Sequence, residues 1–332
     1  MIFIMNDVII ESVPNFSEGR RPEVVHSIRD AMAITPGVKV LNVDIGYDAN
    51  RTVFTIAGPP DQVCEALFKG AEAAVHLIDM RLHEGNHPRM GALDVCPLIP
   101  IKGISYEELI PYAEQLGRRL GEDLSIPVFY YEKSARYPHK SNLAEIRRGE
   151  YEGMGRKMTD PLWNSDNGLV FNAVTGTTAL GVRPFLIAYN VNLESEDVAV
   201  AKKIALHIRA SGYIDSAGTR VPGKLEGVKA IGWWMEEYQC AQVSTNIVDI
   251  TQANPGSVFL AVREEAARFG IEVKSSELIG LLPLATLYQT ARSLSLNDAD
   301  EKSLVRSVEN ALGLADKESF ILEDRIIEYL MS

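Results

Sequence analysis

The residue types best suited to chemistry are concentrated in one segment, His83-Glu-Gly-Asn-His87-Pro-Arg-Met-Gly-Ala-Leu-Asp94. Gly85 separates the two histidines and Pro88 follows the second, which directs His87 toward extended geometry and disfavours a helix. The histidines therefore cannot lie one turn apart on a helix, as a zinc pair does. The pattern predicts a rigid loop that holds an imidazole with Arg89 two residues on, which suits proton transfer beside an anionic substrate.

The overall composition is that of a globular protein with an acidic balance. The 332 residues suffice for two ordinary domains or one large one, and 46% apolar with 23% charged residues exclude a disordered or fibrous chain. The net charge of −12, from 45 acidic and 33 basic residues, argues against nucleic acid or an anionic membrane as a partner. An anionic small substrate is compatible with this charge only where arginines gather locally.

The sequence indicates a cytoplasmic protein. Its three cysteines, Cys64, Cys96 and Cys240, are odd in number and far apart, which favours buried thiols in a reducing compartment over a disulfide framework. The start, Met-Ile-Phe-Ile-Met-Asn-Asp, is apolar but short and has no basic leader, so we expect no signal peptide. No stretch approaches the roughly 20 apolar residues that a membrane-spanning helix needs.

Hydrophobic periodicity divides the first half of the chain into strands and helices. The predicted helices are 18–32 and 61–77, and the predicted strands are 8–13, 38–44, 52–57 and 93–101. Their order, strand, helix, strand, strand, helix, strand, is the split βαβ pattern of ferredoxin-like folds. Ser105 and Glu108 have the spacing of a capping box that begins a further helix, and a strand is expected over 127–131.

A change in residue composition and hydrophobic periodicity near the middle of the chain predicts a domain boundary. Glycine, asparagine and threonine replace the periodic pattern over 143–183, and beyond this stretch the same order of elements returns. The predicted elements of the second half are 185–193, 195–209, 228–235, 241–249, 257–269 and 272–280. We therefore expect an α/β fold of two ferredoxin-like βαββαβ subdomains, 1–182 and 183–332, with a ligand-binding cleft between them.

Several longer motifs carry a resemblance to a known family. They are Val13-Pro-Asn-Phe-Ser-Glu-Gly19, Asn50-Arg-Thr-Val53 with Gly58-Pro-Pro60, His87-Pro-Arg-Met-Gly-Ala-Leu-Asp-Val-Cys-Pro97, Phe185-Leu-Ile-Ala-Tyr-Asn190, Ala241-Gln-Val-Ser-Thr-Asn246 and Arg325-Ile-Ile-Glu-Tyr-Leu330. Through these motifs, which span nearly the whole chain, it resembles the formiminotransferase family. Members of that family move a formimino group from formiminoglutamate to tetrahydrofolate.

The resemblance implies a set of functional residues and partners. It implies that folate, as tetrahydrofolate, is a co-substrate in the groove between the subdomains, that the protein is a homodimer and that no metal takes part. The essential histidine would be His87, assisted by Asp44. The folate-contacting segment would be 168–176, which departs here from the serine-, proline- and tryptophan-rich loop of vertebrate members. The candidates in that segment are Gly168, Leu169, Phe171, Asn172, Thr175 and Gly176. Two-function members continue into a cyclodeaminase domain, so we expect that second activity to reside in a separate protein.

Other candidate residues have two interpretations each. Arg51, Arg89 and Arg183 could bind the carboxylates of formiminoglutamate or of the folate tail, or form ordinary surface ion pairs. Asn15 could contact a ligand or cap the helix that follows Gly19. Asp44 could orient His87 or simply lie in a turn.

The sequence therefore favours a glutamate formiminotransferase in which His87 moves protons, with three rivals. The first is transfer of a formyl group from formylglutamate. The second, of another class, is a metal-dependent hydrolase that uses His83, His87 and Asp94 as ligands. The third is a folate-binding protein without catalysis.

Overall fold

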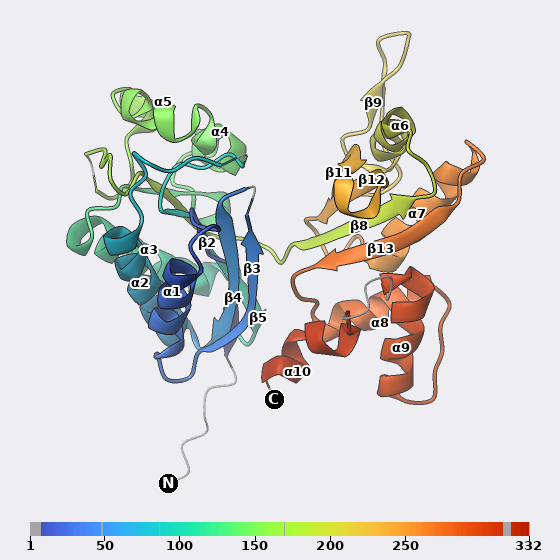
Figure 1. Cartoon of the computed structure of the whole chain (residues 1–332), viewed down its shortest axis with the longest axis horizontal. Helices are drawn as coiled ribbons and strands as arrows, with labels where there is room; N and C mark the ends of the chain where they lie inside the picture. Colours follow the sequence, from blue (N-terminus) through green and yellow to red (C-terminus); the bar gives the residue numbers. More distant parts are fainter. Residues whose placement is uncertain (1–7, 48, 86, 169, 315–319, 332) are drawn as a thin grey trace. The chain divides into compact units, whose positions relative to one another are not determined.

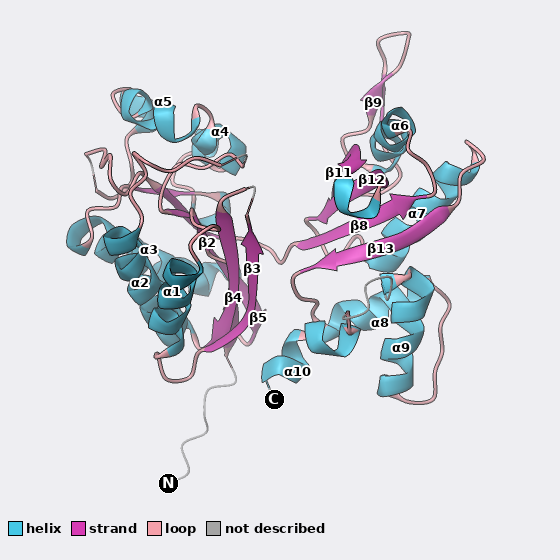
Figure 2. Ribbon diagram, in the orientation of Figure 1, coloured by secondary structure: helices cyan, strands magenta, loops and turns pink. Residues whose placement is uncertain are grey.

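A computed structural model describes residues 8–314, except 48, 86 and 169, and residues 320–331 (Figure 1). The chain divides into two compact units, Met1–Arg183 and Pro184–Ser332. Each unit contains a sheet of at least four strands packed against helices (Figure 2).

The first unit begins with the predicted split βαβ motif. Its elements are β1 (Ile9–Ser12), β2 (Asn15–Phe16), α1 (Pro22–Ala33), β3 (Lys39–Gly46), β4 (Arg51–Gly58), α2 (Pro60–Leu77) and β5 (Leu93–Lys102). Strand β1 pairs antiparallel with both β4 and β5, and β3 pairs with the free side of β4. The first strand of the motif is thus inserted between its third and fourth strands, which is the ferredoxin-like arrangement.

The first unit continues beyond this motif. Further elements are α3 (Tyr106–Asp123), β6 (Val128–Tyr130), α4 (Leu143–Arg147), α5 (Glu150–Lys157) and β7 (Thr178–Val182), with short 3-10 helices at Glu132–Ser134, Pro138–Lys140 and Pro161–Trp163. Strand β7 pairs parallel with β5, and β6 pairs parallel with β7, so the sheet has seven strands among the described residues. The stretch 143–183, where the sequence showed little periodicity, therefore contains two helices and a central strand.

Local sequence explains where the helices begin. Helix α1 starts with Pro22 in its first turn, where a missing N–H costs nothing. The predicted start at Glu18 was four residues early, because the Glu18 carboxylate instead accepts hydrogen bonds from the backbone N–H groups of Arg20 and Arg21, both at 2.9 Å. Helix α3 begins as predicted, with the reciprocal capping box of Ser105 and Glu108.

Two hydrophobic clusters fix the sheet of the first unit. The larger lies between the sheet and helices α1–α3, and its fully buried members include Phe16, Ile28, Met32, Phe54 and Leu67. The smaller packs helices α4 and α5 against the β5, β6 and β7 region, through Val95, Phe129, Ile146, Met154 and Ala179. Burying each large apolar side chain stabilises the unit by about 1.5–3 kcal/mol.

The second unit repeats the motif. Its elements are β8 (Ile187–Leu193), α6 (Val198–Ile208), β9 (Tyr213–Ile214), β10 (Arg220–Val221), β11 (Val228–Met235), β12 (Cys240–Ile247), α7 (Pro255–Ala267) and β13 (Val273–Ile279), with a 3-10 helix at Glu236–Tyr238. The sheet order is β11-β12-β8-β13, antiparallel throughout. The prediction of a two-subdomain α/β fold with the βαββαβ order in each half is confirmed.

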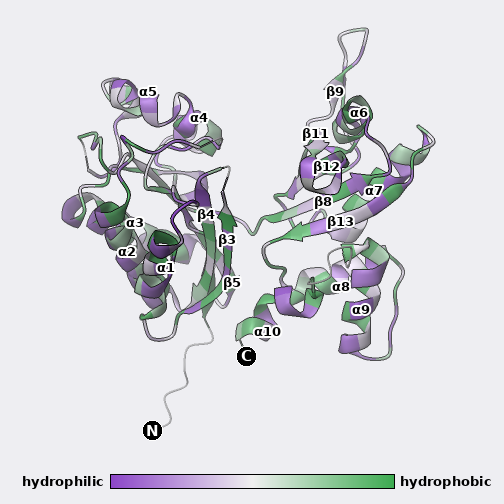
Figure 3. Ribbon diagram, viewed as in Figure 1, coloured by the Kyte–Doolittle hydropathy of each residue, from purple (hydrophilic) through white to green (hydrophobic). Residues whose placement is uncertain are grey.

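A helical extension that the sequence analysis missed follows β13. It consists of α8 (Leu284–Ser293), α9 (Glu301–Leu312), a 3-10 helix (Leu322–Arg325) and α10 (Ile327–Met331). Helix α9 alternates hydrophobic and hydrophilic residues (Figure 3) and buries Val305, Val308 and Leu312. The end of the chain returns to the start of α8, where the Leu282 N–H donates to the Arg325 carbonyl at 2.7 Å.

The three cysteines are buried and carry free thiols, as predicted. Within the described residues, no helix has both the length and the apolar character needed to cross a membrane.

Candidate active site

The segment with the two histidines forms a loop between α2 and β5, and its backbone is packed against other backbone. A Cβ atom added at Gly85 would lie 2.2 Å from the Ala49 carbonyl oxygen, and one at Gly91 would lie 2.1 Å from the Thr177 oxygen. Such distances exclude any larger residue unless the chain moves. The glycines therefore let the loop approach its neighbours closely, which fixes its path.

The end of this loop is joined to the predicted folate-contacting segment. The Ala92 N–H donates to the Thr175 carbonyl at 2.8 Å, and the Thr177 N–H donates to the Met90 carbonyl at 2.8 Å. Between these bonds Gly91 and Gly176 form an isolated antiparallel bridge. The structure thus brings together two segments about 80 residues apart in sequence.

The His87 ring is partly buried and lies against the guanidinium of Arg51. Its Nδ1 is 2.7 Å from the Pro88 carbonyl oxygen, and the Arg51 Nη1 is 2.6 Å from Nδ1 and 3.0 Å from Nε2. A carbonyl oxygen only accepts and a guanidinium only donates. The Pro88 contact fits the tautomer with the hydrogen on Nδ1, in which the Nε2 lone pair faces Arg51. The shorter Arg51 contact at Nδ1 fits the tautomer with the hydrogen on Nε2.

The surroundings of His87 favour its neutral form. Burial lowers the pKa of the imidazole below its ordinary value, and the nearby charge of Arg51 lowers it further, against smaller opposing effects that include the Pro88 hydrogen bond and Asp94. The lowered pKa therefore favours the deprotonated ring, which is the form that can accept a proton from a substrate.

Arg51 is the first residue of β4 and is held from two sides. Its Nε donates to the Asn15 side-chain oxygen at 2.8 Å, and its Nη2 also donates to that oxygen. Its Nη1 is 3.4 Å from the Asp94 Oδ2. Burial lowers the pKa of Arg51 to about 10, with Asp94 opposing, so the side chain remains a cation at neutral pH.

Asp94, the second residue of β5, is fully buried. Its Oδ1 accepts a hydrogen bond from the Met90 N–H at 3.0 Å, and its Oδ2 accepts one from Arg147 Nη2 at 2.8 Å. Sequence reasoning missed Arg147, because it lies in the stretch taken for a domain boundary. The available signal was Asn142, which caps α4 by accepting a hydrogen bond from Ala144.

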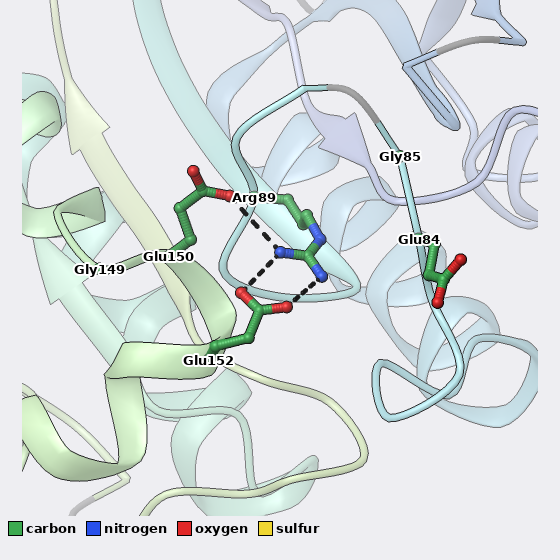
Figure 4. A pocket seen from close by; sticks show the side chains of 6 residues that line it. All are labelled: Glu84, Gly85, Arg89, Gly149, Glu150 and Glu152. Carbon is green, nitrogen blue, oxygen red and sulfur yellow. Dashed lines mark hydrogen bonds and ion pairs between the residues drawn. The ribbon is translucent and has the colours of Figure 1, made fainter.

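Arg89 is paired within the protein. Its guanidinium makes a two-pronged ion pair with Glu152, at 2.6 and 2.9 Å, and lies 3.5 Å from Glu150 (Figure 4). These residues line a cavity of about 470 Å³ together with Glu84 and Gly85. The carboxylate that Arg89 binds here belongs to the chain itself.

His83 serves to hold the loop. Its Nε2 donates to the Asn50 carbonyl at 2.8 Å, and its Nδ1 accepts a hydrogen bond from Arg89 Nε at 3.3 Å. Asn50 has a φ of 47°, and its side chain accepts from the Gly19 N–H and donates to the Glu84 carbonyl. Both ring nitrogens of His83 are thus engaged by protein groups. In the described part of the chain, no three His, Cys, Asp or Glu side chains are placed to share a metal ion.

Two residues predicted from the sequence lie near Arg51 on the same sheet. Asn15 does not cap a helix, because α1 begins at Pro22 and Asn15 is in β2 with its oxygen on Arg51. Asp44 is exposed on β3, opposite Val53, which places it on the same face of the sheet as Arg51. No hydrogen bond or ion pair joins Asp44 to any other residue that the structure describes.

The predicted folate-contacting residues have varied surroundings, and Leu169 lies outside the described residues. Gly168 has a φ of 65°, and Phe171 is partly buried with its ring centroid 6.0 Å from that of Tyr151. The Asn172 side-chain oxygen accepts hydrogen bonds from the N–H groups of Val174 and Thr175 and closes a turn. Thr175 is buried, and Gly176 has a φ of 66°. The second half of this segment is therefore structural support for the His87 loop.

Arg183 is the last residue of the first unit and lies in another part of it. Its N–H donates to the Leu98 carbonyl at 3.1 Å. Burial raises the pKa of Glu11 to about 8, and the charge of Arg183 opposes that rise. Arg183 also hydrogen-bonds the buried Tyr131 side chain. The structure does not join Arg183 to His87.

The structure thus defines an α/β protein of two ferredoxin-like units, the first of which places the partly buried His87 ring against the Arg51 guanidinium. A family model described as "Formiminotransferase domain, N-terminal subdomain" matches residues 9–183, and one described as "Formiminotransferase domain" matches residues 188–332. The chain therefore belongs to the formiminotransferase family, and the resemblance stated from its motifs is confirmed.

Individual relatives match over most of the chain. Formimidoyltransferase-cyclodeaminase of Rattus norvegicus is 42% identical over 97% of this chain, which spans 60% of the length of that relative. Glutamate formimidoyltransferase of Streptococcus pyogenes serotype M1 is 39% identical, over 88% of this chain and 95% of that protein. The protein of the same name from Thermoplasma acidophilum is 37% identical, over 92% of this chain and 99% of its own length.

Proposed function

We propose that the chain is a glutamate formimidoyltransferase, which moves the formimino group from N-formimino-L-glutamate to N5 of tetrahydrofolate and releases L-glutamate. The observation that carries this proposal is the position of the His87 imidazole, which lies against the Arg51 guanidinium in a loop fixed by close backbone contacts. Burial and the charge of Arg51 lower the pKa of this ring, which favours its neutral form. The similarity to two proteins named glutamate formimidoyltransferase, almost over their full lengths, supports it.

His87 moves one proton in the proposed reaction. The lone pair of N5 attacks the formimino carbon, a new C–N bond forms, and the N5 proton passes to Nε2 of the imidazole. The imidazolium then gives this proton to the glutamate nitrogen while the old C–N bond breaks, and its electron pair leaves with glutamate. The imidazole is regenerated, so one neutral histidine serves both half-steps.

Arg51 fits the role of carboxylate partner for the donor. Its Nη1 lies 2.6 Å from Nδ1 and 3.0 Å from Nε2 of His87, so it faces the lone pair of the ring in either tautomer. A carboxylate of formiminoglutamate would offer the guanidinium a stronger, charge-assisted partner and would leave Nε2 open to accept a proton. Arg89 fits this role less well, since Glu152 already takes its two donor positions.

The proposal retains the remaining expectations from the family. Asp44 would orient His87 when substrates are bound, with Asn15 and Arg183 near the ligands. Gly168, Leu169, Phe171, Asn172, Thr175 and Gly176 would contact or support the folate. The protein would be a cytoplasmic homodimer that binds folate. No metal would take part in the reaction.

Steady-state turnover with tetrahydrofolate and each of two donors, formiminoglutamate and formylglutamate, tests the proposal. We expect transfer from formiminoglutamate that survives dialysis against a chelator. Transfer from formylglutamate alone would replace the proposed donor. Loss of activity on chelation, restored by a metal ion, would indicate a metal-dependent enzyme. Folate binding without transfer from either donor would indicate a binding protein.

The substitution His87→Ala tests the role of the ring. Because the imidazole moves a proton and provides little of the ligand contact, turnover should fall by roughly 10²–10⁴ while folate affinity changes little. His26→Ala, which alters an exposed histidine on α1, is the matched control and should leave both quantities unchanged. A large loss of affinity with intact turnover would contradict the assignment.

A further inference from the structure

An ion pair between Asp94 and Arg147, which also contacts Arg51, has no role so far. Asp94 is fully buried and shares its Oδ2 between two arginines, Arg147 at 2.8 Å and Arg51 at 3.4 Å. A buried carboxylate needs such partners, and it binds most strongly to the closer one. Arg147 therefore makes the stronger ion pair with Asp94, and the ion pair between Arg51 and Asp94 is weaker.

We propose that Asp94 and Arg147 form a positioning pair for the reaction: by holding Asp94, Arg147 leaves the Arg51 guanidinium available to His87 and to the substrate carboxylate. This inference rests on the proposed function for its catalytic consequence. Neither residue of the pair touches the reacting atoms. Their effect on the reaction passes through Arg51 and His87.

Helix α4 is built to keep Arg147 in place. Asn142 caps its start, and Ile146 is fully buried in the smaller core cluster. At its other end the Lys157 Nζ donates to the Ile146 carbonyl at 2.6 Å and to the Arg148 carbonyl at 3.3 Å. A lysine on the last carbonyls of a helix satisfies acceptors that have no partner in the helix. The direction of the Arg147 side chain is thus set at both ends of a five-residue helix.

The pair also sets the charge around the imidazole. The charged groups that act on His87 are Arg51 from β4, Arg147 from α4 and Asp94 from β5, and its own loop contributes the Pro88 carbonyl. Two cations and one anion leave an excess of one positive charge, which opposes formation of the imidazolium. Without Arg147 the Asp94 carboxylate would draw Arg51 away from the ring, and the excess charge would disappear.

Two neutral substitutions should therefore move the titration of His87 in opposite directions. We expect the imidazole pKa to rise by about 0.5–1 unit in Arg147→Gln and to fall by a similar amount in Asp94→Asn, because they remove charges of opposite sign. If the pair were only structural, both substitutions would loosen the site and admit water, and both would raise the pKa toward its ordinary value.

The experiment is an NMR titration of the six histidine rings in the full chain without substrates, with the His87 signal assigned from His87→Gln. Arg148→Gln is the matched control, because Arg148 is the next residue along and its side chain is 74% exposed. Arg147→Lys should keep most of the wild-type value because it retains the charge. If Arg147→Gln folds poorly, the double variant with Asp94→Asn removes the unpaired carboxylate and should titrate near the wild type.

Turnover separates this inference from the proposed function. In Arg147→Gln the Michaelis constant for formiminoglutamate should rise several-fold, because Asp94 now competes for Arg51. Shifts of the same sign in Arg147→Gln and Asp94→Asn, or no shift in either, would overturn the positioning role even if His87→Ala abolishes turnover. Opposite shifts in a chain that transfers neither donor would uphold the electrostatic assignment and overturn the proposed function.

Discussion

Replacing Arg51 by methionine should raise the pKa of His87 by about one unit. The Arg51 Nη1 lies 2.6 Å from Nδ1 and 3.0 Å from Nε2, and both of these nitrogens carry a proton in the imidazolium. At an effective dielectric constant of about 20, two unit charges about 4 Å apart repel by about 4 kcal/mol. Because the ring is only partly buried, solvent and salt screen most of this repulsion. We take the unscreened part to be about a third of the full repulsion energy. The repulsion that remains, about 1.4 kcal/mol, corresponds to about one pKa unit.

The assay is the pH dependence of kcat/KM for formimino transfer. In the proposed mechanism the active base is the neutral imidazole, so we expect turnover to be lost as the pH falls through the pKa of His87 in the folded chain. Because burial and Arg51 lower that pKa, the acid limb of the wild type should lie below 6.5. In Arg51→Met the acid limb should lie about one pH unit higher. The plateau of kcat/KM should also be lower, because the variant cannot bind the substrate carboxylate through Arg51.

Arg29→Met provides the matched control for this profile. Arg29 is on α1, partly exposed, and is paired with Asp30. Its loss should leave the acid limb unchanged. A wild-type limb at or above 6.5, or a limb that moves to lower pH in Arg51→Met, would refute the electrostatic reasoning.

Two further predictions concern stability. Gly91→Ala forces a Cβ to within 2.1 Å of the Thr177 oxygen and should lower the free energy of unfolding by about 1–3 kcal/mol, whereas Gly153→Ala, in an open position of α5, should raise it by about 0.5–1 kcal/mol. Urea denaturation measures both, and similar effects from the two would contradict the packing argument. Burial raises the pKa of Glu11 from 4.5 to about 8, so the folded chain holds a proton that the unfolded chain loses, and this contribution to stability is lost as the pH rises through 8. Glu11→Gln should therefore reduce the fall in stability between about pH 5 and pH 9, and an unchanged pH slope would contradict the raised pKa.

The order of elements could be predicted because the hydrophobic pattern of each half is local. The six elements of the βαββαβ motif lie close to their predicted positions in both halves, and the capping box of Ser105 and Glu108 forms as expected. Helices α8 and α9 were missed although α9 buries Val305 and Val308 at helical spacing, which the sequence shows. The parallel pairing of β7 with β5 could not be predicted, since it joins residues about 80 positions apart.

Only some of the residues of the candidate site could be predicted from the sequence. The loop of His87 was identified by its glycines and proline, because such residues act locally on the backbone. The partners of the ring were not identified, since Arg51 and Arg147 reach His87 and Asp94 from distant elements. Asn15 illustrates the same limit, because its side chain binds Arg51 across the sheet instead of the helix nearby in sequence.

The bond between the His87 loop and residues 175–177 has a consequence for ligand binding. Gly176 has a φ of 66°, and a Cβ there would lie 2.3 Å from the Met90 oxygen, so only glycine allows the two backbones to meet. The Ala92 and Thr177 N–H groups then lock the contact on both sides. A ligand that displaced residues 175–177 would therefore also have to displace Met90, three residues from His87. The segment that we propose for folate and the loop that carries the proposed base are thus joined by backbone contacts within the first unit.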